Sequence, residues 1–238
     1  AEIVADEFPN GIHTNSKDEI AHLRTALESK YGKLDVPEND RSFISRTVSY
    51  LVQAGRSTYT ASKNIVVDDS VLLDIKSYID NLNQRDIYYN QIFAEYEGIL
   101  MMTSNVDNPA FLHGVLVWRF PNDYTYSRDY LRKPDAGETV SLAEQIRKIL
   151  AEEGHPMTKK QILSQFPGMT DAMFNNAFYS VPWLIQWEYG VFNCSDNLNI
   201  TEEETLKFQK VIEKLLSEND GYCSQDLLHK NISQELPG

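Results

Sequence analysis

The sequence has few cysteines and no long apolar run. Only Cys194 and Cys223 occur among 238 residues, and they form neither a CxxC pair nor a cysteine and histidine spacing typical of zinc. Disulfides and zinc are therefore not indicated, and we expect both thiols to be free. No stretch approaches the roughly 18 apolar residues that span a bilayer, and the acidic first residues lack the basic start of a secretion signal. We expect a cytoplasmic protein without membrane contact.

Short motifs of the common enzyme classes are also missing. The sequence contains no GxSxG, GxxxxGK[ST] or GxGxxG pattern, so it gives no indication of a nucleophile elbow, a P-loop or a dinucleotide site. No HExxH spacing occurs among the five histidines, which are His13, His22, His113, His155 and His229. Acidic pairs fall at expected helix starts, where negative charge stabilises a helix. We expect a protein that is not an enzyme and has no cofactor, no metal and no small-molecule substrate.

The charge is strongly negative. The formal net charge is −13 and the pI is near 4.8, whereas 42% of the residues are apolar, enough for sizeable cores. Binding to nucleic acid is largely neutralisation of phosphates by Lys and Arg, so a footprint over the whole chain is excluded. A local basic patch remains possible.

One short pattern recurs along the chain. When Tyr59, Tyr124 and Phe192 are placed in one column, an aliphatic pair lies eight and seven positions earlier in each copy, and a serine lies three positions later. The copies are 65 and 68 residues apart. Alternating aromatic and polar residues around a polar turn predict a small β-hairpin in each copy, and the regular spacing predicts an internal repeat.

Helical patterns precede each predicted hairpin. Apolar residues spaced by three and four predict amphipathic helices, and the expected second helices end at Gly98 and Gly168. Asp40, Asn108 and Thr170 are expected N-caps of the third helices. Several first helices open with a capping signal, in which a Glu three residues on reaches back to the cap: Ser16 with Glu19, Ser141 with Glu144, and Thr201 with Glu204. Three helices and a hairpin in about 65 residues predict tandem winged-helix modules, a mainly α fold with small β-hairpins (α+β).

The expected modules divide the chain as follows. Residues 1–15 form a tail or the end of a preceding wing, because FPNGIHTN resembles FPNDYTYS further on. Residues 16–67 form an atypical module, since KLDVPEN is too short for a normal second helix. Residues 68–135 and 139–200 form two further modules, and residues 201–238 supply the first helices of a truncated one. The sequence thus reads as a fragment of a longer repeat protein.

The third copy carries a family resemblance. Its KILAEEGHPMTKKQIL is similar to the opening of helix-turn-helix domains in bacterial transcription proteins, such as the acidic winged-helix domain of the RNA polymerase delta subunit and sigma-factor-like helix-turn-helix regions. The resemblance covers the module and not the whole chain. It implies a cytoplasmic, bacterial, transcription-associated protein that contacts nucleic acid, RNA polymerase or another protein partner.

Basic residues concentrate in the predicted second wing. Between residues 119 and 133 there are four cations and two acids, a local charge of +2. These cations could bind phosphates while a tyrosine such as Tyr126 stacks on a base. In the other interpretation the hairpin is simply solvated, with its arginines paired to Asp123 and Asp129. The complete set of candidate nucleic-acid-binding residues also takes cations from the first copy: Arg119, Arg128, Arg132, Lys133, Tyr126, Arg41, Arg46 and Lys63.

Two functions remain open at this point. In the first, tandem winged-helix modules bind nucleic acid, mainly through the second wing. In the second, the modules form an acidic scaffold that docks on RNA polymerase or another protein. Trp118, Trp183 and Trp187, together with 13 tyrosines, fit the second, because aromatic residues that cores do not use are enriched at protein interfaces. A packed interface between successive modules would account for them equally well.

Overall fold

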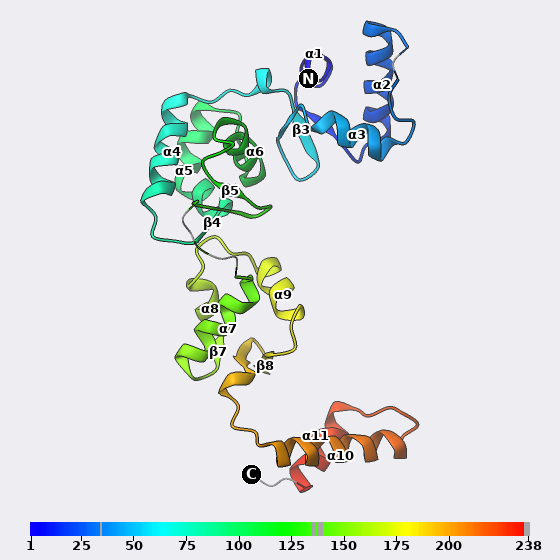
Figure 1. Cartoon of the computed structure of the whole chain (residues 1–238), viewed down its shortest axis with the longest axis vertical. Helices are drawn as coiled ribbons and strands as arrows, with labels where there is room; N and C mark the ends of the chain where they lie inside the picture. Colours follow the sequence, from blue (N-terminus) through cyan, green and yellow to red (C-terminus); the bar gives the residue numbers. More distant parts are fainter. Residues whose placement is uncertain (34, 135–136, 138–139, 236–238) are drawn as a thin grey trace. The chain divides into compact units, whose positions relative to one another are not determined.

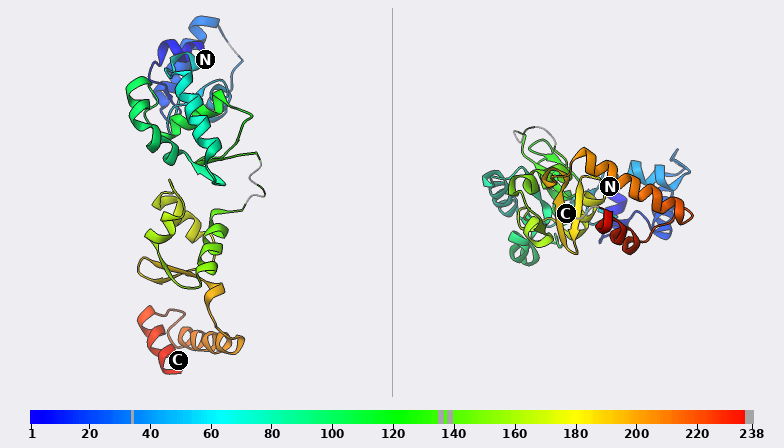
Figure 2. Two further views of the ribbon diagram at one scale, coloured as in Figure 1. Left: turned by 90° about the vertical axis from the view of Figure 1, so that its left-hand side faces the viewer. Right: turned by 90° about the horizontal axis from the view of Figure 1, so that it is seen from below.

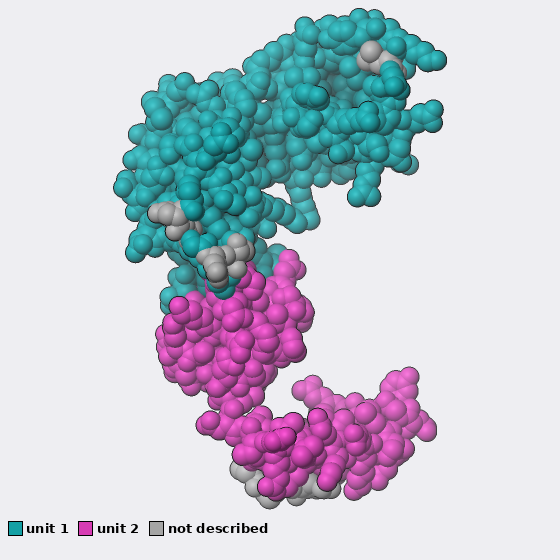
Figure 3. All heavy atoms as spheres, viewed as in Figure 1, with its two compact units in different colours: residues 1–140, 163–175 teal, residues 141–162, 176–238 magenta. Residues whose placement is uncertain are grey.

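The computed structural model describes all residues except 34, 135–136, 138–139 and 236–238. The chain forms two compact units: unit 1 comprises residues 1–140 and 163–175, and unit 2 comprises residues 141–162 and 176–238 (Figure 3). Figure 1 labels the elements in chain order, and Figure 2 shows them from two further directions. The expected boundary between two modules at residues 135 and 139 lies outside the described residues.

The first helix-sheet segment, residues 2–64, builds one end of unit 1. Asn39 caps α3 by accepting a hydrogen bond from the Ser42 backbone N–H at 3.2 Å. The last strand lies between the other two, so that Tyr59 faces both Ile12 and Gln53. The elements in order are α1 (Glu2–Glu7), β1 (Ile12–His13), α2 (Lys17–Tyr31), α3 (Asp40–Val48), β2 (Val52–Gln53), β3 (Thr58–Thr60) and a 3-10 turn, Ser62–Asn64.

The start of this segment differs from the sequence-based expectation. The expectation that residues 1–15 are a tail or a preceding wing is wrong, because β1 pairs antiparallel with β3 and therefore belongs to the first sheet. The helix expected as the first of residues 16–67 is consequently the second, and KLDVPEN connects it directly to α3. The segment is therefore not short of a helix.

The second segment, residues 69–132, has the same order of elements. It comprises α4 (Asp69–Asn81), β4 (Asp86–Tyr88), α5 (Tyr89–Thr103), α6 (Pro109–Arg119), β5 (Thr125–Tyr126) and β6 (Tyr130–Arg132). Its sheet order is again first, third, second. Leu131 of β6 faces Ile87, in the way that Tyr59 faces Ile12, whereas Tyr124 precedes β5. The column that aligned Tyr124 with Tyr59 is therefore out of register by seven residues.

The first hairpin packs on the third helix of the second segment. Gly114 of α6 lies so close to β2 that an added Cβ would be 2.0 Å from the Gln53 carbonyl oxygen. The Asn108 side chain both caps α6, at 2.9 Å from the Phe111 N–H, and donates to the Ala54 carbonyl at 3.0 Å. Only a residue without a side chain permits this approach. The two segments thereby form one body within unit 1.

The third segment, residues 142–197, repeats the strand arrangement. Its elements are α7 (Leu142–Glu153), β7 (Met157–Thr158), α8 (Lys159–Ser164), α9 (Asp171–Tyr179), β8 (Leu184–Glu188), β9 (Val191–Cys194) and a 3-10 turn, Ser195–Asn197. The sheet order is β7-β9-β8, and Phe192 faces Met157. Two further helices follow, α10 (Glu202–Glu218) and α11 (Gln225–Glu235), and Thr201 and Glu204 form the expected capping box of α10.

These elements confirm the coarse fold class, mainly α with small antiparallel sheets. The expected helix end at Gly98 is wrong, because α5 continues to Thr103. Cys194 is buried, Cys223 is partly buried, and both are free thiols, as expected. Within the described residues, no helix is long and apolar enough to cross a membrane.

The close contact at Gly114 leads to a prediction about the stability of a variant with a larger residue at this position. Replacing Gly114 with Ala forces a Cβ into the Gln53 backbone, so we expect a loss of about 1–3 kcal/mol in the free energy of unfolding. Gly98→Ala is the matched control, because its Cβ meets nothing within 4 Å and the site is inside a helix; it should gain about 0.5–1 kcal/mol. Urea denaturation measures both. Equal effects would contradict the close approach.

The burial of His113 leads to a prediction about how the free energy of unfolding depends on pH. Its ring stacks on Tyr89 with centroids 4.5 Å apart, and burial lowers the pKa of His113 against an opposing effect of Asp129. The unfolded chain, with a pKa of about 6.5, therefore takes up the proton first. The contribution of neutral His113 to the free energy of unfolding is therefore complete above about pH 6.5 and is lost as the pH falls towards the pKa of His113 in the folded chain. Between about pH 7.5 and pH 5, His113→Phe should lose less stability than the wild type in denaturant titrations. Equal losses for the two proteins would contradict this prediction.

Candidate nucleic-acid interface

One face of α3 is polar and open to solvent. Phe43 and Ile44 point into the core of the first segment, with 3% and 9% exposure. Because a helix repeats every 3.6 residues, the two residues before this pair and the two residues after it lie on the opposite side of α3. That exposed face carries two arginines and three serines, and no acid: Arg41, Ser42, Ser45, Arg46 and Ser49.

The acid next to this face is already paired. Asp40, at the first position of α3, accepts from Arg24 of α2 at 3.0 Å, and the Arg24 guanidinium lies 4.1 Å from the centre of the Phe43 ring. Arg41 and Arg46 are exposed and have no ion-pair partner in the described part of the chain. Their charges are therefore directed to solvent.

A third free cation lies in the first hairpin. Arg56 stands in the turn between β2 and β3 and is exposed, again without an ion pair among the described residues. The sequence analysis did not select it. A simple signal would have found it: residues 41–67 contain four cations and no Asp or Glu, in a chain of net charge −13. This stretch covers the hairpin and all of α3 except its first residue, Asp40.

Lys63, the fourth cation of that stretch, has a structural contact. Its ammonium group lies 2.6 Å from Asp6 of α1, and this hydrogen bond lowers the pKa of Asp6. The neighbouring Asn64 side chain donates to the Ala5 carbonyl at 3.0 Å. Both contacts hold the end of the first sheet against α1, so Lys63 is less available to a ligand than Arg41 or Arg46.

The second hairpin uses most of its cations internally. Arg132 pairs with Asp86 of β4, and the two side chains are only 10% and 5% exposed. Lys133 donates to the carbonyls of Asp80, at 3.0 Å, and Leu82, at the end of α4, where a cation satisfies free carbonyls. Arg119 pairs with Asp69 at 2.5 Å.

Tyr126 and Arg128 complete the predicted set. The Tyr126 hydroxyl donates to the carbonyls of Leu116 and Phe120 at 3.0 and 2.7 Å, and burial raises the pKa of Tyr126. Its ring therefore packs against α6 and is not a free stacking surface. Arg128 remains open, with a side chain 77% exposed and Asp129 no closer than 3.8 Å. Among the hairpin candidates, Arg128 is thus the one whose charge faces solvent.

Among the described residues, no group of three or more His, Cys, Asp and Glu side chains could hold a metal ion. Of the three tryptophans, Trp118 and Trp187 are 40% and 51% exposed, while Trp183 lies under Arg147, whose guanidinium is 4.9 Å from the ring centre.

The buried ion pair between Arg132 of the second hairpin and Asp86 of β4 has a structural role that a stability measurement can test. Arg132→Met removes the guanidinium that faces the buried Asp86 carboxylate, so we expect a loss of about 3–5 kcal/mol in unfolding free energy, measured by urea denaturation. Arg128→Gln removes only an exposed charge and should change stability by less than about 0.5 kcal/mol. Similar losses for both variants would contradict this assignment.

Comparison with known proteins adds no family. No protein-family model matches the sequence, and no curated protein is similar to it. A solved structure that matches is a bacterial selenocysteine-specific elongation factor, EF-Sec, at 11% identity and a TM-score of 0.28. The alignment covers 92% of this chain and 36% of that one, so the chain spans about a third of its length. A likeness of this size supports no argument about fold or function.

Proposed function

We propose that the chain is a non-catalytic nucleic-acid-binding region built of tandem winged-helix modules, as in bacterial transcription-associated proteins. The repeated order of helix, strand, two helices and hairpin supports the module, with each sheet ordered first, third, second. The observation that carries the binding function is the exposed, acid-free face of α3, which the chain follows with the exposed Arg56 in the turn between β2 and β3.

Contact in this proposal is made by the first segment. Arg41 and Arg46 project from one side of α3, and the other residues on that side are short serines, so the helix can approach a groove closely. The guanidinium groups can bind phosphates or base edges, and serine hydroxyls add further hydrogen bonds. Arg56, at the tip of the adjacent hairpin, is suited to the phosphate backbone.

The third helix of the second segment is less suited to this role. The first hairpin covers α6 at Gly114, and Leu112, Val115 and Leu116 of that helix are fully buried. Three cations of the second hairpin are paired with Asp69, Asp86 or the carbonyls that end α4. The main contact therefore moves from the second hairpin, where the sequence placed it, to α3, and Arg128 becomes an accessory contact.

An acidic docking scaffold for RNA polymerase or another protein is the second candidate. One specific observation favours it: large aromatic side chains stand open in unit 2, with Tyr189 98% exposed at the turn between β8 and β9, Tyr179 80% and Trp187 51%. Exposed Trp and Tyr are typical centres of protein interfaces. The negative net charge of the chain suits a basic partner surface.

A salt titration separates the two candidates. Anisotropy of labelled duplex and single-stranded DNA is measured for the wild type, for Arg41→Gln/Arg46→Gln/Arg56→Gln and for the control Arg128→Gln. If the three cations each neutralise one phosphate, their loss should make the salt slope on duplex shallower by about 3 × 0.9 and reduce affinity at low salt at least about tenfold. Arg128→Gln should change the slope by about one unit at most.

The remaining outcomes decide against this assignment in different ways. A triple variant that binds like the wild type excludes α3 as the interface. A larger effect of Arg128→Gln returns the main contact to the second hairpin. No binding of the wild type to either DNA at low salt leaves the docking scaffold as the better function.

A further inference from the structure

A polar hollow lies between the first hairpin and the connection from α5 to α6. Its volume is about 400 Å³, which is within the range of small-molecule sites. The lining comes from the turn before β1, from the first hairpin and from the residues that end the connection and begin α6, all within unit 1. Most of the lining side chains are polar: Asn10, Thr58, Thr60, Asn105, Asp107 and Asn108.

Backbone contacts hold the walls of the polar hollow. Gly11 has a φ of +87°, and an added Cβ would be 2.9 Å from the Tyr59 carbonyl oxygen, so the turn before β1 lies directly on β3. In the connection from α5 to α6, the Asn108 side chain donates to the Ala54 carbonyl at 3.0 Å. The Asn105 amide makes two hydrogen bonds with the backbone that leads into α4. These contacts fix the shape of the hollow in the free chain.

Two hydroxyl groups of the polar hollow have no partner. Thr60 is only 3% exposed, yet its hydroxyl forms no hydrogen bond in the described part of the chain. Thr58 lies two residues earlier on the same face of β3, and its hydroxyl makes none among the described residues either. A buried hydroxyl without a hydrogen bond costs free energy. The hollow therefore contains donors and acceptors that a bound molecule can satisfy.

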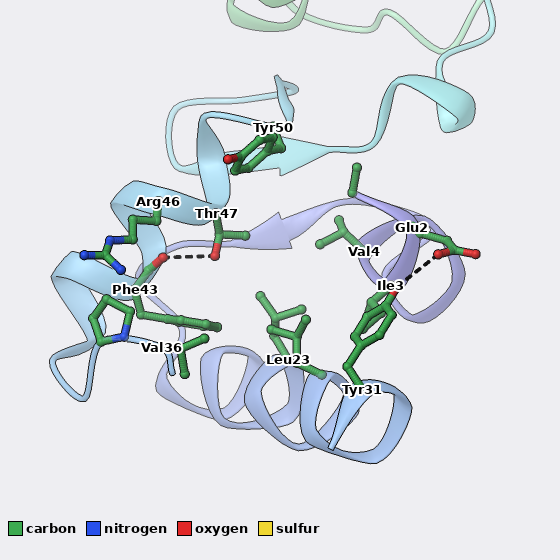
Figure 4. A pocket seen from close by; sticks show the side chains of 13 residues that line it. Glu2, Ile3, Val4, Leu23, Tyr31, Val36, Phe43, Arg46, Thr47 and Tyr50 are labelled. Atoms are coloured by element: carbon green, nitrogen blue, oxygen red, sulfur yellow. Dashed lines mark hydrogen bonds between the residues drawn. The ribbon is translucent and has the colours of Figure 1, made fainter. Parts of the chain in front are cut away.

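Two hydroxyl groups at a hollow beside α1 are, by contrast, used within the chain. Figure 4 shows Thr47 donating to the Phe43 carbonyl, at 2.9 Å, and Tyr31 donating to the Glu2 carboxylate, at 3.1 Å. Leu23 and Phe43, which line that hollow, belong to the core of the first segment. The unpartnered hydroxyl groups distinguish the polar hollow from it.

Asp107 gives the polar hollow a negative charge. One of its carboxylate oxygens accepts from the Asn108 side chain at 2.7 Å, and the residue is exposed, without an ion pair among the described residues. A carboxylate only accepts hydrogen bonds, so it attracts N–H donors and repels phosphate. Asn10 adds an exposed amide that can donate and accept. The hollow thus suits a neutral ligand with adjacent N–H groups and a carbonyl beside them.

Guanine is the nucleobase with this pattern on its Watson–Crick edge. Its N1–H and N2–H groups are adjacent donors, and O6 is an acceptor beside them. Adenine and cytosine place a ring-nitrogen acceptor next to their amino group, and thymine places N3–H between two carbonyls, so a carboxylate is repelled by each. Between the lining residues Ala54 and Thr58 the chain carries the exposed Arg56, which is suited to a phosphate.

We propose that the polar hollow binds an unpaired guanine of a nucleic-acid strand whose phosphate contacts Arg56. The inference rests on the proposed nucleic-acid-binding function and adds a base preference to it. Asp107 accepts from N1–H and N2–H, and the Thr60 hydroxyl and the Asn10 amide are donors available to O6. A paired guanine is excluded, because its N1–H and N2–H groups are already bonded to cytosine.

The test uses labelled single strands of dT that carry one central dG, dA or dC, since a lone guanine cannot form a quadruplex. Anisotropy at low salt gives the affinity of the full chain for each strand. We expect the dG strand to bind about tenfold more tightly than the dA or dC strand, as for a well-placed bidentate contact.

Two variants that change one carboxylate each locate the contact. Asp107→Asn keeps the size and the acceptor for Asn108 but replaces the free oxygen with an N–H donor, so the preference for dG should disappear. Asp74→Asn is the matched control: it removes an exposed carboxylate of α4, outside the hollow, and should keep the preference.

Thr60→Val replaces the unpartnered hydroxyl with a methyl group of similar size. The preference for dG should fall severalfold, while the urea midpoint should not fall, because the hydroxyl has no partner in the free chain. A lower midpoint with an unchanged preference would remove Thr60 from the site and overturn the assignment.

The remaining outcomes separate this inference from the proposed function. Equal binding of the dG and dA strands, a preference for dA or dC, or a dG preference that survives Asp107→Asn overturns the guanine site while nucleic-acid binding stands. Binding of duplex DNA alone has the same meaning. No binding to duplex or to any single strand overturns both.

Discussion

The close approach of Gly114 to the Gln53 carbonyl is the constraint on which unit 1 depends. It places the first hairpin against α6, and this contact has opposite consequences for two helices that occupy the same position in their segments. The first hairpin covers α6 at Gly114, while Leu112, Val115 and Leu116 of that helix are buried in the core of its own segment. α3 keeps one side in solvent. Two copies of similar architecture therefore differ in which of them can meet a ligand.

The first and second segments also differ in how many of their cations are paired. In the second segment three cations contact acids or helix-end carbonyls: Arg119 contacts Asp69, Arg132 contacts Asp86 and Lys133 contacts the end of α4. The stretch 41–67 contains no Asp or Glu, and of its cations only Lys63 forms an ion pair, with Asp6 of α1. A count of local charge therefore overstates the free charge of the second hairpin. What decides availability is the distance from each cation to an acid that is far away in sequence.

The sequence was sufficient for the coarse fold and for part of the candidate site. Helical periodicity and caps located most helices, because a side-chain cap and a buried stripe are local properties, as at Ser16, Asn108 and Thr201. Arg41 and Arg46 were selected as the cations of the third helix predicted in the first copy, and the structure leaves both side chains exposed. Arg56 was missed because a single arginine in a turn has no periodic pattern. The burial of Arg132 could not be predicted either, since Asp86 is 46 residues away.

The errors at the amino end have one physical origin. β1 consists of two residues, Ile12 and His13, and no propensity makes such a short stretch extended. It becomes a strand because Tyr59 and Thr58 pair with it from more than 40 residues further along the chain. Without that strand the helix after it is counted as the first of its segment, and α1 is left unassigned. Once β1 is recognised, α1 takes the place of α4 and α7, before the first strand of its sheet.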